Sequence, residues 1–240
     1  MKRHGVRCDV GRVRSGQDWR EAPLAMGVVA GPVFASAFTV VGARTTGYDW
    51  RRHAVSSLAN GRLGWMQRAN FIVTGLLYVG AASGLAKCSR RIVGSRAIPM
   101  LVGAAGFGLV GSGMFATDPV GGFPPASPED QPTDAAPPES RKPTRTGALH
   151  NVCALPIFLG IPVAGLVGAA SFVRHREYLW AGYSAGSSIG MVGSFMLFGS
   201  AFRHSAHNAG VFQRLSIAAG FGWLSALSLR ALTSLRRDRS

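Results

Sequence analysis

The sequence is poor in cysteine and in acidic residues, and it lacks the short motifs that mark common enzymes. Its three cysteines, Cys8, Cys88 and Cys153, are widely separated and form no C-x-x-C pair, so neither a zinc ribbon nor a disulfide framework is indicated. No Walker loop, dinucleotide fingerprint, nucleophile elbow or zinc-protease helix occurs. We therefore expect neither a cofactor nor a bound metal, and the sequence favours a non-enzymatic role without deciding the matter.

Charged residues are scarce as well, and their distribution is uneven. They make up 15% of the 240 residues, against about 25% in a typical soluble domain. They occur in short clusters separated by long apolar stretches, and hydrophobic residues account for 47% of the chain. Because a helix needs about 20 mostly apolar residues to cross ~30 Å of hydrocarbon, this pattern predicts an integral membrane protein.

The net charge of +15 has two interpretations. In a soluble protein such an excess would suggest a nucleic-acid partner. In a membrane protein, lysine and arginine flank the spans, fix their orientation and contact anionic headgroups. We prefer the second interpretation, which predicts membrane lipid as a partner and no nucleic acid.

Six apolar segments follow a basic stretch at residues 1–21, which we expect to be a disordered tail. Each is long enough to span a membrane, and the second is the shortest. They lie at residues 22–43, 69–86, 97–117, 148–173, 180–202 and 211–229. The sequence thus predicts an all-α fold, a polytopic bundle of six transmembrane helices over residues 22–232, followed by a basic tail at 233–240.

Small residues are frequent in these segments. Gly80 with Gly84, and Gly186 with Gly190, form pairs spaced by four residues, a spacing that lets neighbouring helices approach closely. We interpret both pairs as packing sites within one chain, in preference to a dimer interface.

Proline is concentrated between the third and fourth segments. Eight prolines fall within residues 118–146, which predicts a flexible, extended loop. Pro32, Pro156 and Pro162 instead fall inside predicted spans. Each removes a backbone donor and favours a kink, which a helical bundle tolerates.

The basic residues also predict an orientation. Six spans place both termini on one side, and sixteen of the 26 lysines and arginines lie on that side. Short cytoplasmic segments carry the excess of lysine and arginine. We therefore expect a multi-pass protein of the cell membrane with both termini in the cytoplasm and the loop at 118–146 outside.

Unusual polar residues gather at the predicted outer ends of the helices. Such groups are costly at membrane depth and tend to serve function, although each alone also fits an ordinary interfacial position. The candidates for an outward-facing ligand pocket are His53, Ser56, Trp65, Gln67, Asn70, Asp118, His150 and Arg214. Residues 54–60 fit a short interfacial helix, and no catalytic residue is indicated.

Several of these residues belong to a recognisable set of motifs. The run His53-x-x-Ser56-x-Leu58, then Gly64-Trp65-x-Gln67-x-x-Asn70-Phe71-x-x-Thr74-Gly75, resembles the prokaryotic membrane family catalogued as domain of unknown function number 998. The stretches Asp118-Pro119-x-x-Gly122-Phe123-Pro124-Pro125, Gly147-x-Leu149-His150 and Gln213-Arg214 are similar to it too. The resemblance covers roughly residues 22–232 and implies a six-helix membrane protein. It implies no activity, substrate or catalytic residue, and nothing functional is carried onto residues 126–143.

Three functions are compatible with this sequence. The first is binding of a lipid headgroup or a small polar ligand in the outer pocket, with Arg52, Arg68 or Arg214 countering an anion. The second is a structural or accessory role for a membrane-protein partner, or within a homo-oligomer, through closely packed helix faces.

The third and least favoured function is a metal-dependent, membrane-embedded hydrolase. Its zinc ligands would come from His53, Asp118, His150, His204 and His207. Only His204 and His207 have a local spacing typical of a metal site, whereas such sites need a closely fixed ligand set.

Overall fold

The regular secondary structure of the chain is helical. The computed structural model describes residues 18–92, 95–119, 122–124, 144–204 and 206–237. Its α-helices are α1 Asp18–Ala43, α2 Gly64–Ile92, α3 Ala97–Met114, α4 Arg145–Leu155, α5 Ile161–Arg174, α6 Tyr178–Arg203 and α7 Ala209–Arg237. A short 3₁₀-helix, η1, covers Ser56–Asn60, as the sequence predicts for residues 54–60, and a π-helical turn, η4, covers Pro156–Gly160.

The described residues contain six helical segments long and apolar enough to cross a membrane, as predicted: Glu21–Ala43, Gly64–Cys88, Ala97–Met114, Arg145–Arg174, Tyr178–Arg203 and Ala209–Arg237. The expectation that the second span is the shortest is wrong. Helix α2 has 29 residues, and α3, with 18, is the shortest span. Polar residues in the first turns of α2 lower its hydropathy there but do not end the helix, and two of them, Arg68 and Asn70, bond to α3 and α1.

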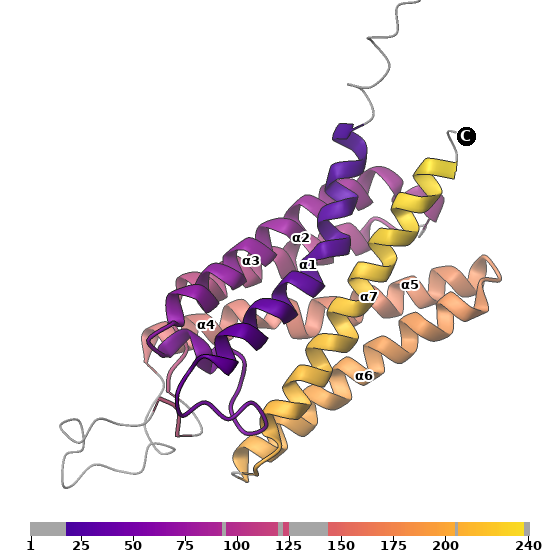
Figure 1. Ribbon diagram of the computed structural model, residues 1–240. Coiled ribbons are helices and arrows are strands. Elements are labelled where there is room, and N and C mark those ends of the chain that lie inside the picture. The colour runs from indigo at the N-terminus through magenta and orange to yellow at the C-terminus, as the bar shows by residue number, and fades with distance from the viewer. Residues whose placement is uncertain (1–17, 93–94, 120–121, 125–143, 205, 238–240) are drawn as a thin grey trace, which may run out of the picture.

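The helices form a closed ring in which each span packs against the next along the chain. Helix α7 completes the ring by packing against both α6 and α1. The start of α1 and the end of α7 lie at the same end of the bundle (Figure 1), where Arg236 forms a salt bridge of 2.8 Å with Glu21. We call this the termini end. The opposite end carries residues 44–63, 115–119, 122–124, 204 and 206–208, and we call it the cap end.

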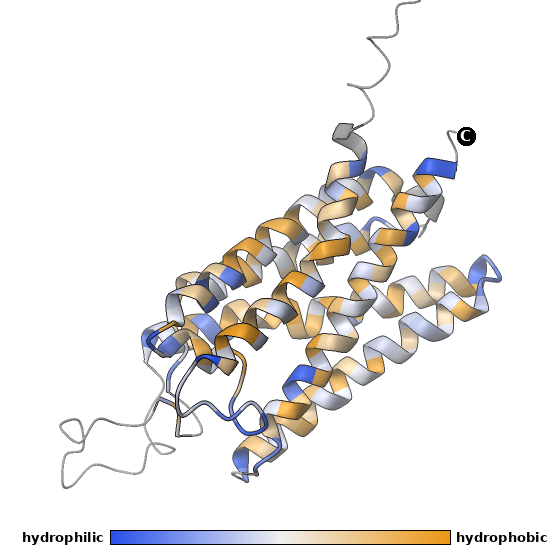
Figure 2. Cartoon of the chain, in the orientation of Figure 1, coloured by the Kyte–Doolittle hydropathy of each residue, from blue (hydrophilic) through white to orange (hydrophobic). Residues whose placement is uncertain are grey.

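The surface of the bundle follows the expected membrane pattern. Figure 2 shows hydrophilic residues gathered at the two ends, with apolar residues along the helices between them. Large apolar side chains such as Met100, Phe107 and Leu159 face outward on these helices. In water this would be costly, whereas lipid chains solvate such a surface well.

Aromatic side chains fill the centre of the bundle. The ring of Phe34 in α1 lies 5.4 Å from that of Phe71 in α2 and 5.2 Å from that of Phe221 in α7. Trp223, also buried in α7, donates a hydrogen bond of 2.9 Å from its indole to the Ser184 hydroxyl of α6. These contacts fix α1, α2, α6 and α7 relative to one another.

Glycines set how closely the helices approach. Gly75 of α2 and Gly106 of α3 face each other so tightly that a Cβ on Gly106 would lie 2.8 Å from the Gly75 carbonyl oxygen. The prediction of internal packing is confirmed for Gly80 and Gly84, where added Cβ atoms would meet side chains of α1. It is wrong for Gly186, since no atom lies within 4 Å of such a position and that face of α6 is open.

Prolines shape two of the spans. The fourth span widens into the π-helical turn η4 at Pro156, which lacks the amide hydrogen of a regular helix, and Pro162 stands in the first turn of α5. Pro32 lies inside α1. Three regions lie outside the described residues. They are residues 1–17 of the predicted tail at 1–21, most of the proline-rich loop (125–143), and residues 238–240.

Candidate functional site at the cap end

The loop that follows α1 is fastened to α7 by one arginine. Arg214 donates a hydrogen bond of 2.6 Å to the Tyr48 hydroxyl, and a second of 3.3 Å to the carbonyl oxygen of His53. Its guanidinium also lies over the rings of Phe38 and Tyr48, at 5.5 and 5.8 Å from their centroids. Arg214 is therefore held on several sides by the protein itself.

Tyr48 completes the same contact. Its hydroxyl points at the carbonyl oxygens of His53 and Ala54, at 3.3 and 3.1 Å, and donates its proton to this pair. Burial raises the pKa of the Tyr48 phenol above its ordinary value, and the positive charge and hydrogen bond of Arg214 oppose that rise. The phenol is thus kept neutral as a donor at physiological pH.

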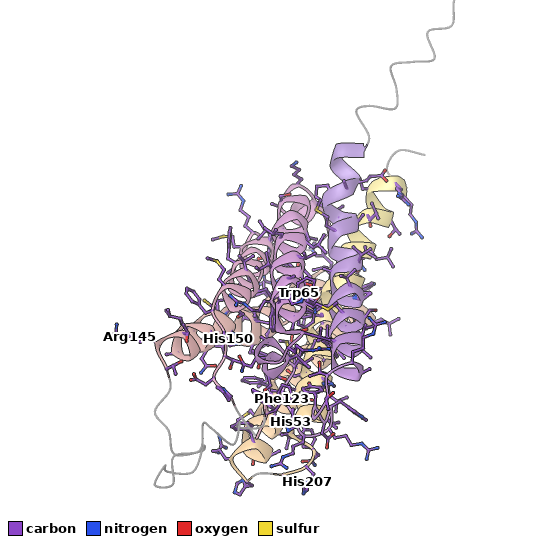
Figure 3. The ribbon with its side chains drawn as sticks, turned by 60° about the vertical axis from the view of Figure 1, so that its left-hand side comes forward. His53, Trp65, Phe123, Arg145, His150 and His207 are labelled. Carbon is purple, nitrogen blue, oxygen red and sulfur yellow. The ribbon has the colours of Figure 1, made fainter. Side chains whose placement is uncertain are left out.

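His53 is buried within this loop and packs against two aromatic rings that also contact each other. Its ring centroid lies 5.6 Å from that of Tyr48 and 5.4 Å from that of Phe123 (Figure 3). Its Nδ1 accepts a hydrogen bond of 2.9 Å from the backbone N–H of Asp49. Because a backbone N–H can only donate, the lone pair of Nδ1 is used in this turn.

Gln213 provides a second link between α7 and the same loop. Its side-chain oxygen accepts a hydrogen bond of 2.6 Å from the backbone N–H of Val55, and both residues are buried. This amide precedes η1, so the bond fixes where the short helix begins. Gly210, one turn earlier in α7, faces the carbonyl oxygens of Trp50 and His53 with no room for a side chain.

The cap end of α3 is closed by side chains from two other helices. Arg68 of α2 donates to the carbonyl oxygens of Gly113 and Met114, at 3.0 and 2.8 Å. His150 of α4 places Nδ1 3.0 Å from the carbonyl oxygen of Ser112 and 2.9 Å from that of Phe115. The last carbonyls of a helix have no partner within it and carry a partial negative charge. Arg68 supplies both a hydrogen-bond donor and a positive charge here, and His150 supplies a second partner for these carbonyls.

Asp118 has the complementary role at the start of α4. Its carboxylate accepts hydrogen bonds from the backbone N–H and the hydroxyl of Thr144, which is the N-cap residue of that helix. A Cβ on Gly147 would collide with this carboxylate, so the acid lies directly over the first turn of α4. A negative charge is favourable at a helix N-terminus.

A row of buried polar side chains runs along α2. The side-chain nitrogen of Asn70 donates 3.1 Å to the Phe34 carbonyl oxygen of α1 and lies 3.4 Å from the Gln67 side-chain oxygen. The hydroxyl of Thr74 lies 3.4 Å from the Asn70 side-chain oxygen. The side-chain nitrogen of Gln67 and the hydroxyl of Ser57 in η1 have no hydrogen-bond partner among the described residues.

A third group of side chains faces outward. Trp65 begins α2 and is 69% exposed. Arg44 follows α1 directly, and Arg62 lies in the turn before α2; both are exposed. Ser56, the first residue of η1, is half-buried.

The structure thus brings all eight predicted residues to one end of the bundle but divides them among these groups. His53 joins Arg214, Gln67 joins Asn70, and Asp118 and His150 each serve a different helix end. Figure 3 shows His53 beside Phe123, with His150 set apart from both. No hydrogen bond between described residues joins Asp118, His53 and His150 into one cluster.

Sequence reasoning missed Tyr48, Arg44 and Arg62 as candidate residues. Phe123 and Gln213 appear in the family-like motifs but were not assigned a role. The arginines were counted only as topology charges. The one available signal for Tyr48 was its position beside Asp49 and Trp50, a polar and aromatic run at a helix end.

The described residues contain no group of three or more His, Cys, Asp or Glu side chains that could hold a metal ion. The Nδ1 atoms of His53 and His150 are both occupied by backbone groups. His204, after α6, likewise places Nδ1 2.8 Å from the Ser200 carbonyl oxygen. The ligand set of the hydrolase hypothesis does not come together.

Comparison with known proteins identifies a family. Neither the curated proteins nor the solved structures give a match. A family profile described as protein of unknown function, DUF998, matches residues 28–230. That region runs from α1 to α7 and contains every motif noted above, so the chain belongs to the DUF998 family.

Proposed function

We propose that the protein binds the headgroup of an anionic phospholipid at its cap end. The observation that carries the proposal is the pair Arg44 and Arg62. Both are exposed, and no acidic side chain of the described residues forms a salt bridge with either. Their chain neighbours Gly61 and Thr45 are in contact, since a Cβ on Gly61 would be 3.4 Å from the Thr45 methyl carbon. The two arginines therefore lie on adjacent segments of the cap end.

The surroundings of the pair support a position at headgroup depth. Trp65 follows Arg62 by three residues and is exposed, and tryptophan is enriched where the membrane meets water. Each guanidinium can donate two parallel hydrogen bonds to a phosphate. Arg214 is not available for this role because protein groups already occupy it.

The cap end is proposed to face outward, because the excess of lysine and arginine lies with the termini. A cysteine at position 135, in a variant lacking the native cysteines, tests this. It should react with a membrane-impermeant maleimide in intact cells. Labelling that requires permeabilised cells would place the cap end in the cytoplasm instead.

The binding proposal is tested with purified protein in a nonionic detergent. Dioleoyl phosphatidylglycerol should bind more tightly than dioleoyl phosphatidylcholine, as measured by native mass spectrometry. Each arginine near an anionic surface contributes about 1 kcal/mol, so Arg44→Gln with Arg62→Gln should weaken binding of the anionic lipid by roughly 30-fold.

A matched control removes the same charge from the same end. Arg145→Gln with Arg203→Gln also replaces two exposed arginines and should leave the affinity unchanged. Equal losses in both double variants would mean that net charge alone attracts the lipid. Glycerol 1-phosphate binding as tightly as the lipid would assign the site to a free phosphate compound.

A second candidate function, an accessory role through self-association, is favoured by the open face of α6. Leu179, Ile189 and Met196 are 91%, 68% and 69% exposed, and Gly182, Gly186 and Gly193 between them have no atom near an added Cβ. This alternating spacing of three and four residues suits a helix pair. A second copy in the same membrane presents the same face at the same depth.

Cross-linking tests this second candidate. In a variant without native cysteines, Gly186→Cys should form a disulfide-linked dimer in membranes. Leu166→Cys, on an exposed position of α5, should not. A monomer with Gly186→Cys would contradict self-association through α6.

A further inference from the structure

An apolar groove of about 570 Å³ runs along the outer face of α1. Its volume lies within the range of ~300–1,000 Å³ that small-molecule sites occupy. The lining residues are Val29, Pro32, Val33, Ser36, Ala37, Val40 and Val41 of α1, with Met66 of α2 at one side. The groove therefore opens on the lipid-facing surface of the bundle.

The sequence of α1 explains why this face is hollow. Its large aromatic residues, Phe34 and Phe38, are buried towards the other helices. The opposite face carries only short side chains at helical spacing, such as Val33 and Ala37. Met66 projects from the start of α2 and forms a wall beside them.

The length of the groove matches one leaflet of a bilayer. Val29 and Val41 are twelve residues apart, which corresponds to about 18 Å along a helix at 1.5 Å per residue. Half of the ~30 Å hydrocarbon core is about 15 Å. An acyl chain that starts at the cap end would thus lie in the groove over most of its length.

The two arginines that carry the proposed function do not line the groove, but each lies four residues along the chain from a residue that does. Arg44 follows Val40 by four residues and so continues the groove face of α1 to the cap end. Arg62 precedes the groove residue Met66 by four residues. An apolar groove with two cations in the segments beyond its cap-end residues is complementary to a chain with an anionic head.

We infer that the groove on α1 seats one acyl chain of a phospholipid from the leaflet at the cap end, while Arg44 and Arg62 hold its phosphate. This inference rests on the proposed headgroup site. It adds the acyl chain, which sets how deeply the lipid lies in the membrane and contributes to its affinity. The site is then specific for a two-part ligand, an anionic head joined to a long chain.

A variant that fills the groove tests the acyl-chain contact separately from the headgroup contact. Val33 is 41% exposed in the groove, and Val163 is 48% exposed on α5 outside it. Val33→Trp should weaken binding of dioleoyl phosphatidylglycerol by about tenfold, because buried methylene groups lose their contacts. Dihexanoyl phosphatidylglycerol, whose short chains end near the cap, should bind Val33→Trp as it binds the unmodified protein.

Val163→Trp should bind both lipids like the unmodified protein, and its thermal unfolding temperature should match that of Val33→Trp. Ser36→Leu is a smaller groove-filling change and should show the same preference for the short-chain lipid. Unchanged dioleoyl binding in both groove variants would overturn the acyl-chain seat. If the Arg44 and Arg62 variants still lost affinity, the headgroup proposal would survive that result.

Discussion

Arg214 of α7 donates a hydrogen bond to the Tyr48 hydroxyl across 2.6 Å, although the two residues lie 166 positions apart. This bond joins the last span to the loop that follows the first. It does so at the cap end, where the ring of helices closes. The outward-facing residues Arg44 and Arg62 lie on either side of this loop, so their placement depends on that closure.

Loss of either partner should therefore loosen the cap. Arg214→Gln should lower the free energy of unfolding by about 1.5–3 kcal/mol, the range for hydrogen bonds to charged groups. Tyr48→Phe should cost less, because Arg214 then keeps its hydrogen bonds to the carbonyl oxygens of His53 and Gly210. Reversible unfolding in mixed SDS micelles measures both, and the double variant should show a coupling energy of ~1 kcal/mol or more. Arg203→Gln, an exposed arginine, serves as the control, and strictly additive losses would contradict the contact.

The raised pKa of Tyr48 predicts a dependence on alkaline pH. Burial favours the neutral phenol in the folded protein. The contribution of Tyr48 to the unfolding free energy is therefore fully present below the ordinary phenol pKa of about 10. It is lost as the pH rises through the folded-state pKa. Between pH 9 and 11, the unfolding free energy of the unmodified protein should fall more steeply than that of Tyr48→Phe. Parallel curves would show that Tyr48 titrates as an exposed phenol.

His150 should act as a hydrogen-bond donor to α3 and not as a base or ligand. Its Nδ1 lies between two carbonyl oxygens, which only accept, so this atom carries the proton. His150→Asn retains a donor at the same place and should keep most of the stability. His150→Leu should lose about 1–3 kcal/mol, because two buried carbonyls lose their partner. Equal stability of the two variants in thermal unfolding would refute the capping role.

The spans could be predicted because each helix carries an unbroken apolar run in the sequence. The start of α2 is the instructive exception. The helix begins at Gly64, five residues before the predicted span. The predicted span starts too late because Gln67 and Arg68 interrupt the apolar pattern. Gln67 is buried among neighbouring helices and Arg68 reaches the end of α3. Both contacts depend on tertiary structure, which hydropathy does not contain.

The roles of the polar candidates could not be predicted for a related reason. His150 contacts free carbonyl groups at the end of α3, and Asp118 bonds to the N-cap residue of α4. The sequence does not show where α3 stops or which helix lies beside it. Arg44 and Arg62 are the converse case. In the sequence they are two of many basic residues. The contact between their neighbours Gly61 and Thr45, which brings the two segments together, is not visible there.

Close contact between α2 and α3 should make Gly106 far less replaceable than an equally central glycine of α6. A Cβ at Gly106 would lie 2.8 Å from the Gly75 carbonyl oxygen and 2.9 Å from the Val79 amide nitrogen. Backbone atoms cannot move aside as a side chain can, so Gly106→Ala should destabilise the protein by at least ~1–3 kcal/mol.

Gly182→Ala is the matched control, because nothing lies within 4 Å of its Cβ position. Alanine favours a helix over glycine by up to about 1 kcal/mol, so this variant should be neutral or slightly more stable. The two unfolding curves, measured in the same detergent, should shift in opposite directions or differ by more than 1 kcal/mol. If both variants unfolded alike, the backbones of α2 and α3 would have to lie further apart at Gly106 than these distances give.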